Sequence, residues 1–156
     1  MRLSLCLAAA FAALSITAGS ATAMDCSATP AVSQAVIRMV NAEREQRGQS
    51  PVRLSSELNK VAQRHACDMA RRDYFGHRSP EGTSLKGRVY SSGYKACQAA
   101  ENLVRGVVTP QQANAAWMGS HGHRSNILWR GVEEAGIGLS GKGANMKWVL
   151  VLARAC

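Results

Sequence analysis

Residues 135–153 read AGIGLSGKGANMKWVLVLA, and this stretch decides the fold class. Two apolar runs flank a Ser-Gly-Lys-Gly turn at residues 140–143, which is the pattern of a β-hairpin. We expect one strand over residues 135–139 and a second over residues 148–153. This part of the chain therefore predicts an antiparallel sheet.

Four helices are predicted upstream of this hairpin. The first lies between residues 30 and 48, because a Thr-Pro pair precedes it and a glycine follows it. The second begins at Ser55 or Ser56, and its apolar residues recur at helical spacing. A second Thr-Pro pair opens a helix at residues 110–119, and a short helix is expected between residues 83 and 89.

The remaining segments complete the predicted α+β fold. Residues 99–107 are expected to form a strand with Glu101 at its start, and His77 lies on a glycine- and proline-containing loop. A loop from Ser120 is expected to deliver His123. The order of elements predicts one domain, in which helices pack on an antiparallel sheet.

Three polar side chains on the predicted helices have less specific roles. Asn41 and Arg44 lie near the end of the first helix, where they can hydrogen-bond to neighbouring loops or belong to a solvated face. His65 lies on the apolar face of the second helix, which favours a hydrogen-bonded core residue over a ligand. We expect His121 to face solvent.

The first 23 residues have the form of an export signal. Arg2 precedes an apolar run, and residues 21–23 read Ala-Thr-Ala, a cleavage-site pattern. The mature chain would then be a single domain, residues 24–156, secreted or periplasmic, with no membrane span. We expect a monomer.

Charge indicates the class of partner. The net charge is +9, and loss of Arg2 with the signal leaves +8. Such an excess of positive charge favours binding to acidic surfaces such as anionic lipid or wall polymers. A basic surface that only keeps the protein soluble would account for the charge equally. Scattered basic residues and predicted export both argue against nucleic acid.

Four cysteines remain after the signal, and an even number in an exported chain predicts two disulfides. Three connectivities are possible. We expect Cys67 to pair with Cys97 and the near-terminal Cys26 to pair with Cys156. No C-x-x-C spacing supports a metal site at these cysteines.

His77, Glu101 and His123 are the candidate functional residues. Two imidazoles and one carboxylate can supply three metal ligands with an open fourth position, or an acid/base set. Their spacing alone does not show that they meet.

The motifs around these residues resemble the CAP superfamily of cysteine-rich secretory, antigen 5 and pathogenesis-related 1 proteins, and its secreted bacterial branch in particular. The pieces occur in order across roughly residues 34–153. They are Asn41-x-x-Arg44, Leu58-x-x-x-Ala62-x-x-His65-x-x-x-Met69, Phe75-Gly76-His77, Glu101-Asn102-Leu103, Trp117-x-x-Ser120-x-x-His123-Arg124-x-Asn126-Ile127-Leu128 and Ala135-Gly136-Ile137-Gly138.

The resemblance implies a three-layer α-β-α sandwich with a central antiparallel sheet and a groove. In animal and plant members the groove holds two histidines and two glutamates that can bind zinc or another divalent cation. His77, Glu101 and His123 match three of these positions, whereas Ser120 stands where the second glutamate would fall. We place Ser120 and Asn126 in the groove. A missing carboxylate weakens any mechanism that needs two.

Three functions are consistent with these residues. The first is a binding module for a lipid, wall-polymer or protein ligand, with a possible Zn²⁺ or other divalent cation in the groove. The second is a zinc-dependent hydrolase of peptides or wall polymers, in which Glu101 is the catalytic residue as a general base. In the third, the trio is a structural polar network. The absence of a Gly-x-Ser-x-Gly motif favours binding.

Overall fold

The computed structural model describes residues 26–156, so the expected export signal at residues 1–23 lies outside the described part. Each predicted helix is found, with its capping residue in place. In chain order the elements are α1 (Pro30–Glu45), β1 (Arg53–Leu54), α2 (Ser56–Arg71), α3 (Leu85–Ser91), β2 (Ala96–Arg105), α4 (Pro110–Gly119), α5 (His121–Ile127), β3 (Glu134–Ser140), the 3₁₀ turn η1 (Gly143–Asn145) and β4 (Lys147–Ala155). The side chains of Thr29, Ser55, Ser84 and Thr109 accept hydrogen bonds from the first turns of their helices.

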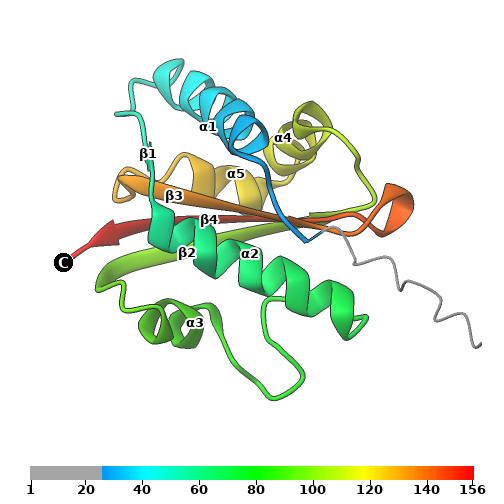
Figure 1. Cartoon of the computed structure of the whole chain (residues 1–156). Helices are drawn as coiled ribbons and strands as arrows, with labels where there is room; N and C mark the ends of the chain where they lie inside the picture. Colours follow the sequence, from blue (N-terminus) through cyan, green and yellow to red (C-terminus); the bar gives the residue numbers. More distant parts are fainter. Residues whose placement is uncertain (1–25) are drawn as a thin grey trace, which may run out of the picture.

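The four strands form one sheet in the order β1-β3-β4-β2 (Figure 1). β3 and β4 form the predicted hairpin, and β2 pairs antiparallel with the other side of β4. The prediction of an antiparallel sheet is thus confirmed for the three long strands. β1 adds a two-residue parallel edge beside β3, which the sequence analysis did not predict.

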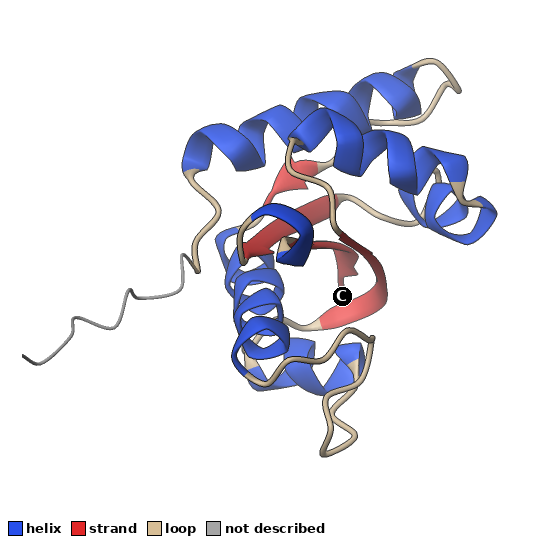
Figure 2. Cartoon of the chain, turned by 90° about the vertical axis from the view of Figure 1, so that its right-hand side faces the viewer, coloured by secondary structure: helices blue, strands red, loops and turns tan. Residues whose placement is uncertain are grey.

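Helices cover both faces of this sheet, as Figures 1 and 2 show. The even-numbered residues 148–152 of β4 pack in one core with α1, α4 and α5, whereas the odd-numbered residues 149–153 pack in a second core with α2 and α3. A strand buried on both faces needs apolar residues at every position. The uninterrupted apolar run of β4 therefore specifies the three-layer α-β-α sandwich.

Two glycines of β3 allow α2 to lie directly against the sheet. A Cβ atom at Gly136 would overlap the backbone of Leu58, and one at Gly138 would overlap the backbone of Ala62. No side-chain movement can relieve an overlap with backbone. The Ala-Gly-Ile-Gly motif is therefore a packing requirement of the α2–β3 contact.

The end of α1 is tied to the loop that follows α5. The Arg44 side chain is 1% exposed, and its guanidinium donates hydrogen bonds to four backbone carbonyls. The four acceptors are Ser50, Ile127, Trp129 and Val132. Asn41 both donates to and accepts from the backbone of Val52. Hydrogen bonding of both residues to loops is confirmed.

Two disulfides are present, but the expected pairing is wrong. Cys26 bonds to Cys67 and Cys97 bonds to Cys156, instead of Cys67 to Cys97 and Cys26 to Cys156. The antiparallel register pairs Ala96 with Ala155, which brings Cys97 beside Cys156 at the end of the β2–β4 ladder. The chain before α1 is held against α2, where the Ala28 amide donates to Gln63 Oε1 at 2.7 Å, and this brings Cys26 to Cys67.

Two further expectations need correction. His123 lies in helix α5 and not on a loop, because a new helix starts immediately after Ser120, whose carbonyl accepts from the Arg124 amide. β2 starts at Ala96, so Glu101 lies in the middle of its strand. His77 does lie on a loop, as predicted.

Candidate functional site

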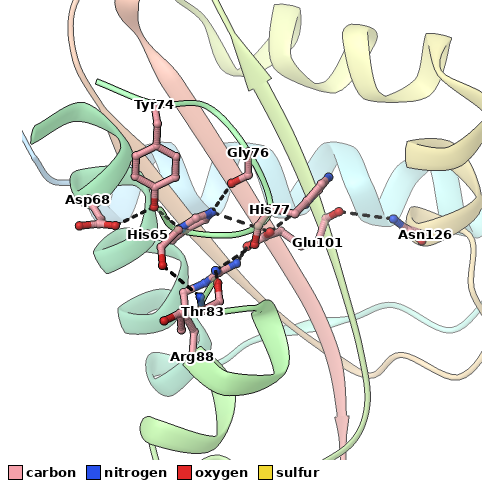
Figure 3. A network of polar contacts seen from close by, with 10 residues as sticks. His65, Asp68, Tyr74, Gly76, His77, Thr83, Arg88, Glu101 and Asn126 are labelled. Atoms are coloured by element: carbon pink, nitrogen blue, oxygen red, sulfur yellow. Dashed lines mark hydrogen bonds and ion pairs between the residues drawn. The ribbon is translucent and has the colours of Figure 1, made fainter. Parts of the chain in front are cut away.

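A buried carboxylate at the centre of β2 organises the candidate site (Figure 3). The Glu101 side chain is 2% exposed, and Oε1 accepts a hydrogen bond from His77 Nδ1 at 2.9 Å. Oε2 accepts from Arg88 Nη2 at 2.7 Å. Both oxygens of this buried acid are therefore partnered, one of them by a permanent cation, as a buried charge requires.

Arg88 also fixes the loop that carries His77. It lies on α3, and its Nη1 donates to the carbonyls of His77 at 3.0 Å and Thr83 at 3.1 Å. One guanidinium thus joins α3, the loop after α2 and strand β2. Arginine can make these bonds because its guanidinium carries several N–H donors in one plane, whereas the ammonium group of lysine does not.

The contact with Glu101 determines the protonation pattern of His77. Because a carboxylate only accepts, Nδ1 carries the proton, and Nε2 keeps its lone pair when the ring is neutral. The hydrogen bond to Glu101 raises the pKa of His77 above its ordinary value. The His77 side chain is 58% exposed, so this oriented imidazole is accessible from solvent.

His65 is the second imidazole close to Glu101, and it is buried as a core residue. Its Nε2 donates to the Gly76 carbonyl at 2.9 Å and lies 3.9 Å from Glu101 Oε1. Burial lowers the pKa of His65. The neighbouring Tyr74 hydroxyl donates to Asp68 at 2.6 Å. The interpretation of His65 as a hydrogen-bonded core residue is confirmed, and its proximity to Glu101 was not foreseen.

His123 lies near this centre without joining it. Asn102, next to Glu101 in β2, donates to the His123 carbonyl at 2.9 Å and accepts from Asn126 Nδ2 at 2.9 Å. Burial is the main cause that lowers the pKa of His123, and the positive charge of His77 adds to it. The asparagine pair thus attaches α5 to β2, and a bond from His123 to Glu101 is not found among residues 26–156.

The donor set does not fit a metal ion held by all three predicted ligands. Within the described part of the chain, no three histidine, cysteine, aspartate or glutamate side chains form a group that could hold one. Arg88 and His77 already occupy both oxygens of Glu101. In this arrangement Glu101 orients His77 instead of presenting a free oxygen to a cation.

A cavity of about 1330 Å³ lies beside this centre, between α3 and β2. Residues 96–101 of β2 form one side of it, and Leu85, Val89 and Tyr90 of α3 form another. Asn126 is among its lining residues, whereas Ser120 is not. We call this cavity the α3–β2 groove.

Arg88 and Asn102 are the site residues that the sequence analysis did not single out as functional. A lone arginine in a seven-residue helix has no spacing that links it to a glutamate on a later strand. Asn102 was quoted only as part of a motif. His121 is exposed, as expected.

The family model described as "CAP: Cysteine-rich secretory protein family" matches residues 37–152. The uncharacterized protein YkwD of Bacillus subtilis is 35% identical over 118 residues, which are 76% of this chain and 46% of that protein. The uncharacterized membrane protein YlbC of the same organism is 29% identical over 107 residues, 69% of this chain and 31% of that protein. The chain therefore spans less than half the length of either relative.

Solved structures share the fold. An extracellular SCP-domain protein from Bacillus anthracis superposes with a TM-score of 0.71 and 24% identity, covering 80% of this chain and 40% of that one. An outer surface protein from Borrelia burgdorferi gives a TM-score of 0.73 with 15% identity over 79% of this chain and 92% of that one. NaASP2, crystallised with Zn²⁺, gives 0.58 with 16% identity over 80% of each chain.

Proposed function

Because the chain belongs to the cysteine-rich secretory protein (CAP) family, we propose that it is an extracytoplasmic binding module whose ligand occupies the α3–β2 groove. The observation that carries this proposal is the groove itself. Its volume of about 1330 Å³ is larger than the roughly 300–1,000 Å³ of pockets for small molecules. An elongated lipid, wall-polymer or protein ligand suits such a space.

Export is supported by the cysteines and by the relatives. Two disulfides join the four cysteines of residues 26–156, and such bonds persist in oxidising compartments. The B. anthracis neighbour is described as extracellular and the Borrelia neighbour as an outer surface protein. None of the helices in the described part is long and apolar enough to cross a membrane.

The partners of Glu101 favour binding over hydrolysis by this carboxylate. A general base must reach the proton that it removes, but both Glu101 oxygens are engaged by His77 and Arg88. Activation of water by Glu101 would require one of these bonds to break. The same bonds place a hydrogen-bonded polar group at the groove, beside Leu85 and Val89 of α3.

One observation favours a hydrolase as the second candidate. Glu101 holds the Nδ1 proton of His77, which leaves Nε2 able to accept a proton from a substrate or water. In that case His77, and not Glu101, is the base. His77→Ala would abolish turnover of a peptide or wall substrate, whereas a binding module has no turnover to lose.

The binding proposal is tested by filling the groove. Residues 24–156 would be incubated with insoluble peptidoglycan, with anionic vesicles and with neutral vesicles, and the bound fraction measured after sedimentation. Ala99 lines the groove, so Ala99→Trp should lower binding to the retained probe at least about tenfold, a loss of about 1.4 kcal/mol. Ala144 is exposed and does not line the groove, so Ala144→Trp is the matched control.

The outcomes are distinct. Binding that Ala99→Trp abolishes and Ala144→Trp preserves supports the groove as the site. Equal binding by both variants places the site elsewhere and contradicts the proposal.

A further inference from the structure

Given the proposed function, on which this inference rests, we propose that the groove binds an extended acidic peptide, which pairs through its main chain with the free edge of β2. The ligand would then add a strand to the sheet next to β2. This form of recognition obtains affinity from main-chain hydrogen bonds and specificity from alternating side-chain contacts.

The position of β2 in the sheet supports main-chain pairing. β2 is the last strand in the order β1-β3-β4-β2 and pairs with β4 alone. Across residues 26–156 no other strand covers its outer edge. The edge of such a strand presents unpaired N–H and C=O groups wherever no other element covers it; on β2 this applies to the residues before Glu101, whose carbonyl accepts from Asn126.

The groove follows that edge. All six consecutive residues 96–101 line it. Side chains of a strand alternate between the two faces of its sheet, so a lining that includes six consecutive residues is consistent with a groove that follows the edge of β2. A register irregularity between Ala96 and Gln98 disturbs one end, and at the other end the Glu101 carbonyl already accepts from Asn126 Nδ2 at 3.5 Å. Residues 98–100 are therefore the open part of the edge.

Residues of α3 and residues in and after α5 line the groove together with β2. Leu85, Val89 and Tyr90 of α3 form one wall, and Asn126 and Trp129, which come from and follow α5, also line the groove. An added strand would direct alternate side chains toward opposite faces of the sheet. Tyr90 and Trp129 are 84% and 38% exposed, and such exposed aromatic residues are typical anchors of protein interfaces.

The positive charge of the residues that line the groove favours an acidic ligand. Arg78, Lys86 and Lys95 line the groove, and Glu101 is the only acidic side chain among the lining residues. Arg88 already pairs with Glu101 at 2.7 Å, so the remaining field is positive. Acidic side chains near the lysines would complement it.

The free strand edge distinguishes a peptide from the other ligands that a basic groove could take. An acidic glycan or an anionic lipid complements the positive charge, but neither offers the regular alternation of N–H and C=O groups that pairs with a strand. We therefore place peptide first, and binding of a glycan or lipid is an outcome of the test.

The test uses a displayed library of random dodecapeptides, selected on immobilised residues 24–156. The most enriched peptide is then synthesised with a fluorescent label, and its Kd is measured by anisotropy. Two further versions carry N-methyl groups on the odd-numbered or the even-numbered residues. Because a pairing strand directs only alternate N–H groups at its neighbour, one version should lose at least about tenfold in affinity while the other keeps it.

Protein variants test the charge. Lys86→Glu combined with Lys95→Glu should weaken binding of the selected acidic peptide at least about tenfold. Lys142 is exposed in the turn between β3 and β4 and does not line the groove, so Lys142→Glu should leave the Kd unchanged.

Three results would overturn the peptide proposal: no enriched sequence, enrichment without acidic residues, or equal affinity of both N-methylated versions. If peptidoglycan or vesicles still bind in a manner that Ala99→Trp abolishes, the groove remains the binding site and only the peptide assignment fails. If Ala99→Trp changes no interaction, the proposed function fails as well.

Discussion

Arg88 Nη2 lies 2.7 Å from Glu101 Oε2, and the two side chains are only 12% and 2% exposed. The positive charge of Arg88 thereby compensates the negative charge of Glu101, which strand β2 places in the protein interior. The same guanidinium holds the His77 carbonyl, so one residue determines both the charge balance and the shape of the site.

Removing this cation should destabilise the fold strongly. Arg88→Met leaves the Glu101 carboxylate buried without its cation, and we expect the free energy of unfolding to fall by about 3–5 kcal/mol at neutral pH. Denaturant unfolding measures the change. Arg53→Met removes the 76%-exposed partner of Glu134 and should cost about 0–1 kcal/mol. Equal losses in the two variants would contradict a buried pair, whereas adding Glu101→Gln to Arg88→Met should recover part of the loss.

The pH dependence of stability should carry the signature of His77. Its pKa in the folded state is raised by Glu101, so its contribution is complete below the unfolded value of about 6.5 and is lost as pH rises through the folded pKa. The stability difference between wild type and His77→Gln should therefore decrease as the pH increases above about 6.5. Denaturation at several pH values measures it.

His65 should give the opposite pH dependence of stability. Burial lowers its folded pKa, so His65 contributes a loss of stability as pH falls below about 6.5. Histidine ring titrations by NMR should give a higher pKa for His77 than for His65. The reverse order would show that Glu101 does not hold His77 in solution.

The glycines of β3 should tolerate no side chain. Gly138→Ala places a Cβ against the backbone of Ala62 in α2, and we expect a loss near the upper end of the roughly 1–3 kcal/mol typical of overpacking. Gly122→Ala in α5 meets nothing within 4 Å and should be neutral or slightly stabilising. Thermal unfolding compares them. A neutral Gly138→Ala would mean that α2 is not held against β3.

Each disulfide should contribute similarly to stability. The bonds close loops with sequence separations of 41 and 59 residues. Double Cys→Ser replacement of either pair should therefore lower the free energy of unfolding by about 4 kcal/mol in the chain-entropy model. Each of the four cysteines falls in its own tryptic peptide. Non-reducing peptide mapping should recover Cys26 with Cys67, and a peptide joining Cys67 to Cys97 would contradict the structure.

Local sequence signals were sufficient for most of the secondary structure. Thr29 and Thr109 cap their helices as predicted, and the β3–β4 hairpin forms around its glycine turn. These signals depend on residues a few positions apart. β1 was missed because two residues carry no periodicity, and its parallel pairing depends on β3, about 80 residues later.

The candidate site was predicted only in part, because it too depends on contacts between residues far apart in the sequence. The sequence indicated His77 and Glu101, and the structure joins them at 2.9 Å. It did not indicate Arg88, whose role depends on α3 packing beside β2, and it did not separate His123 from Glu101.

By itself, the sequence determined the apolar run of β4, the helix caps and the glycines of β3, because each is a local property of the chain. Only the tertiary structure decided the pairing of Cys97 with Cys156, the partners of Glu101 and the free edge of β2. These depend on the register and order of strands distant in sequence. Burial then gives Glu101 its role, since a carboxylate removed from water must find its cation within the fold.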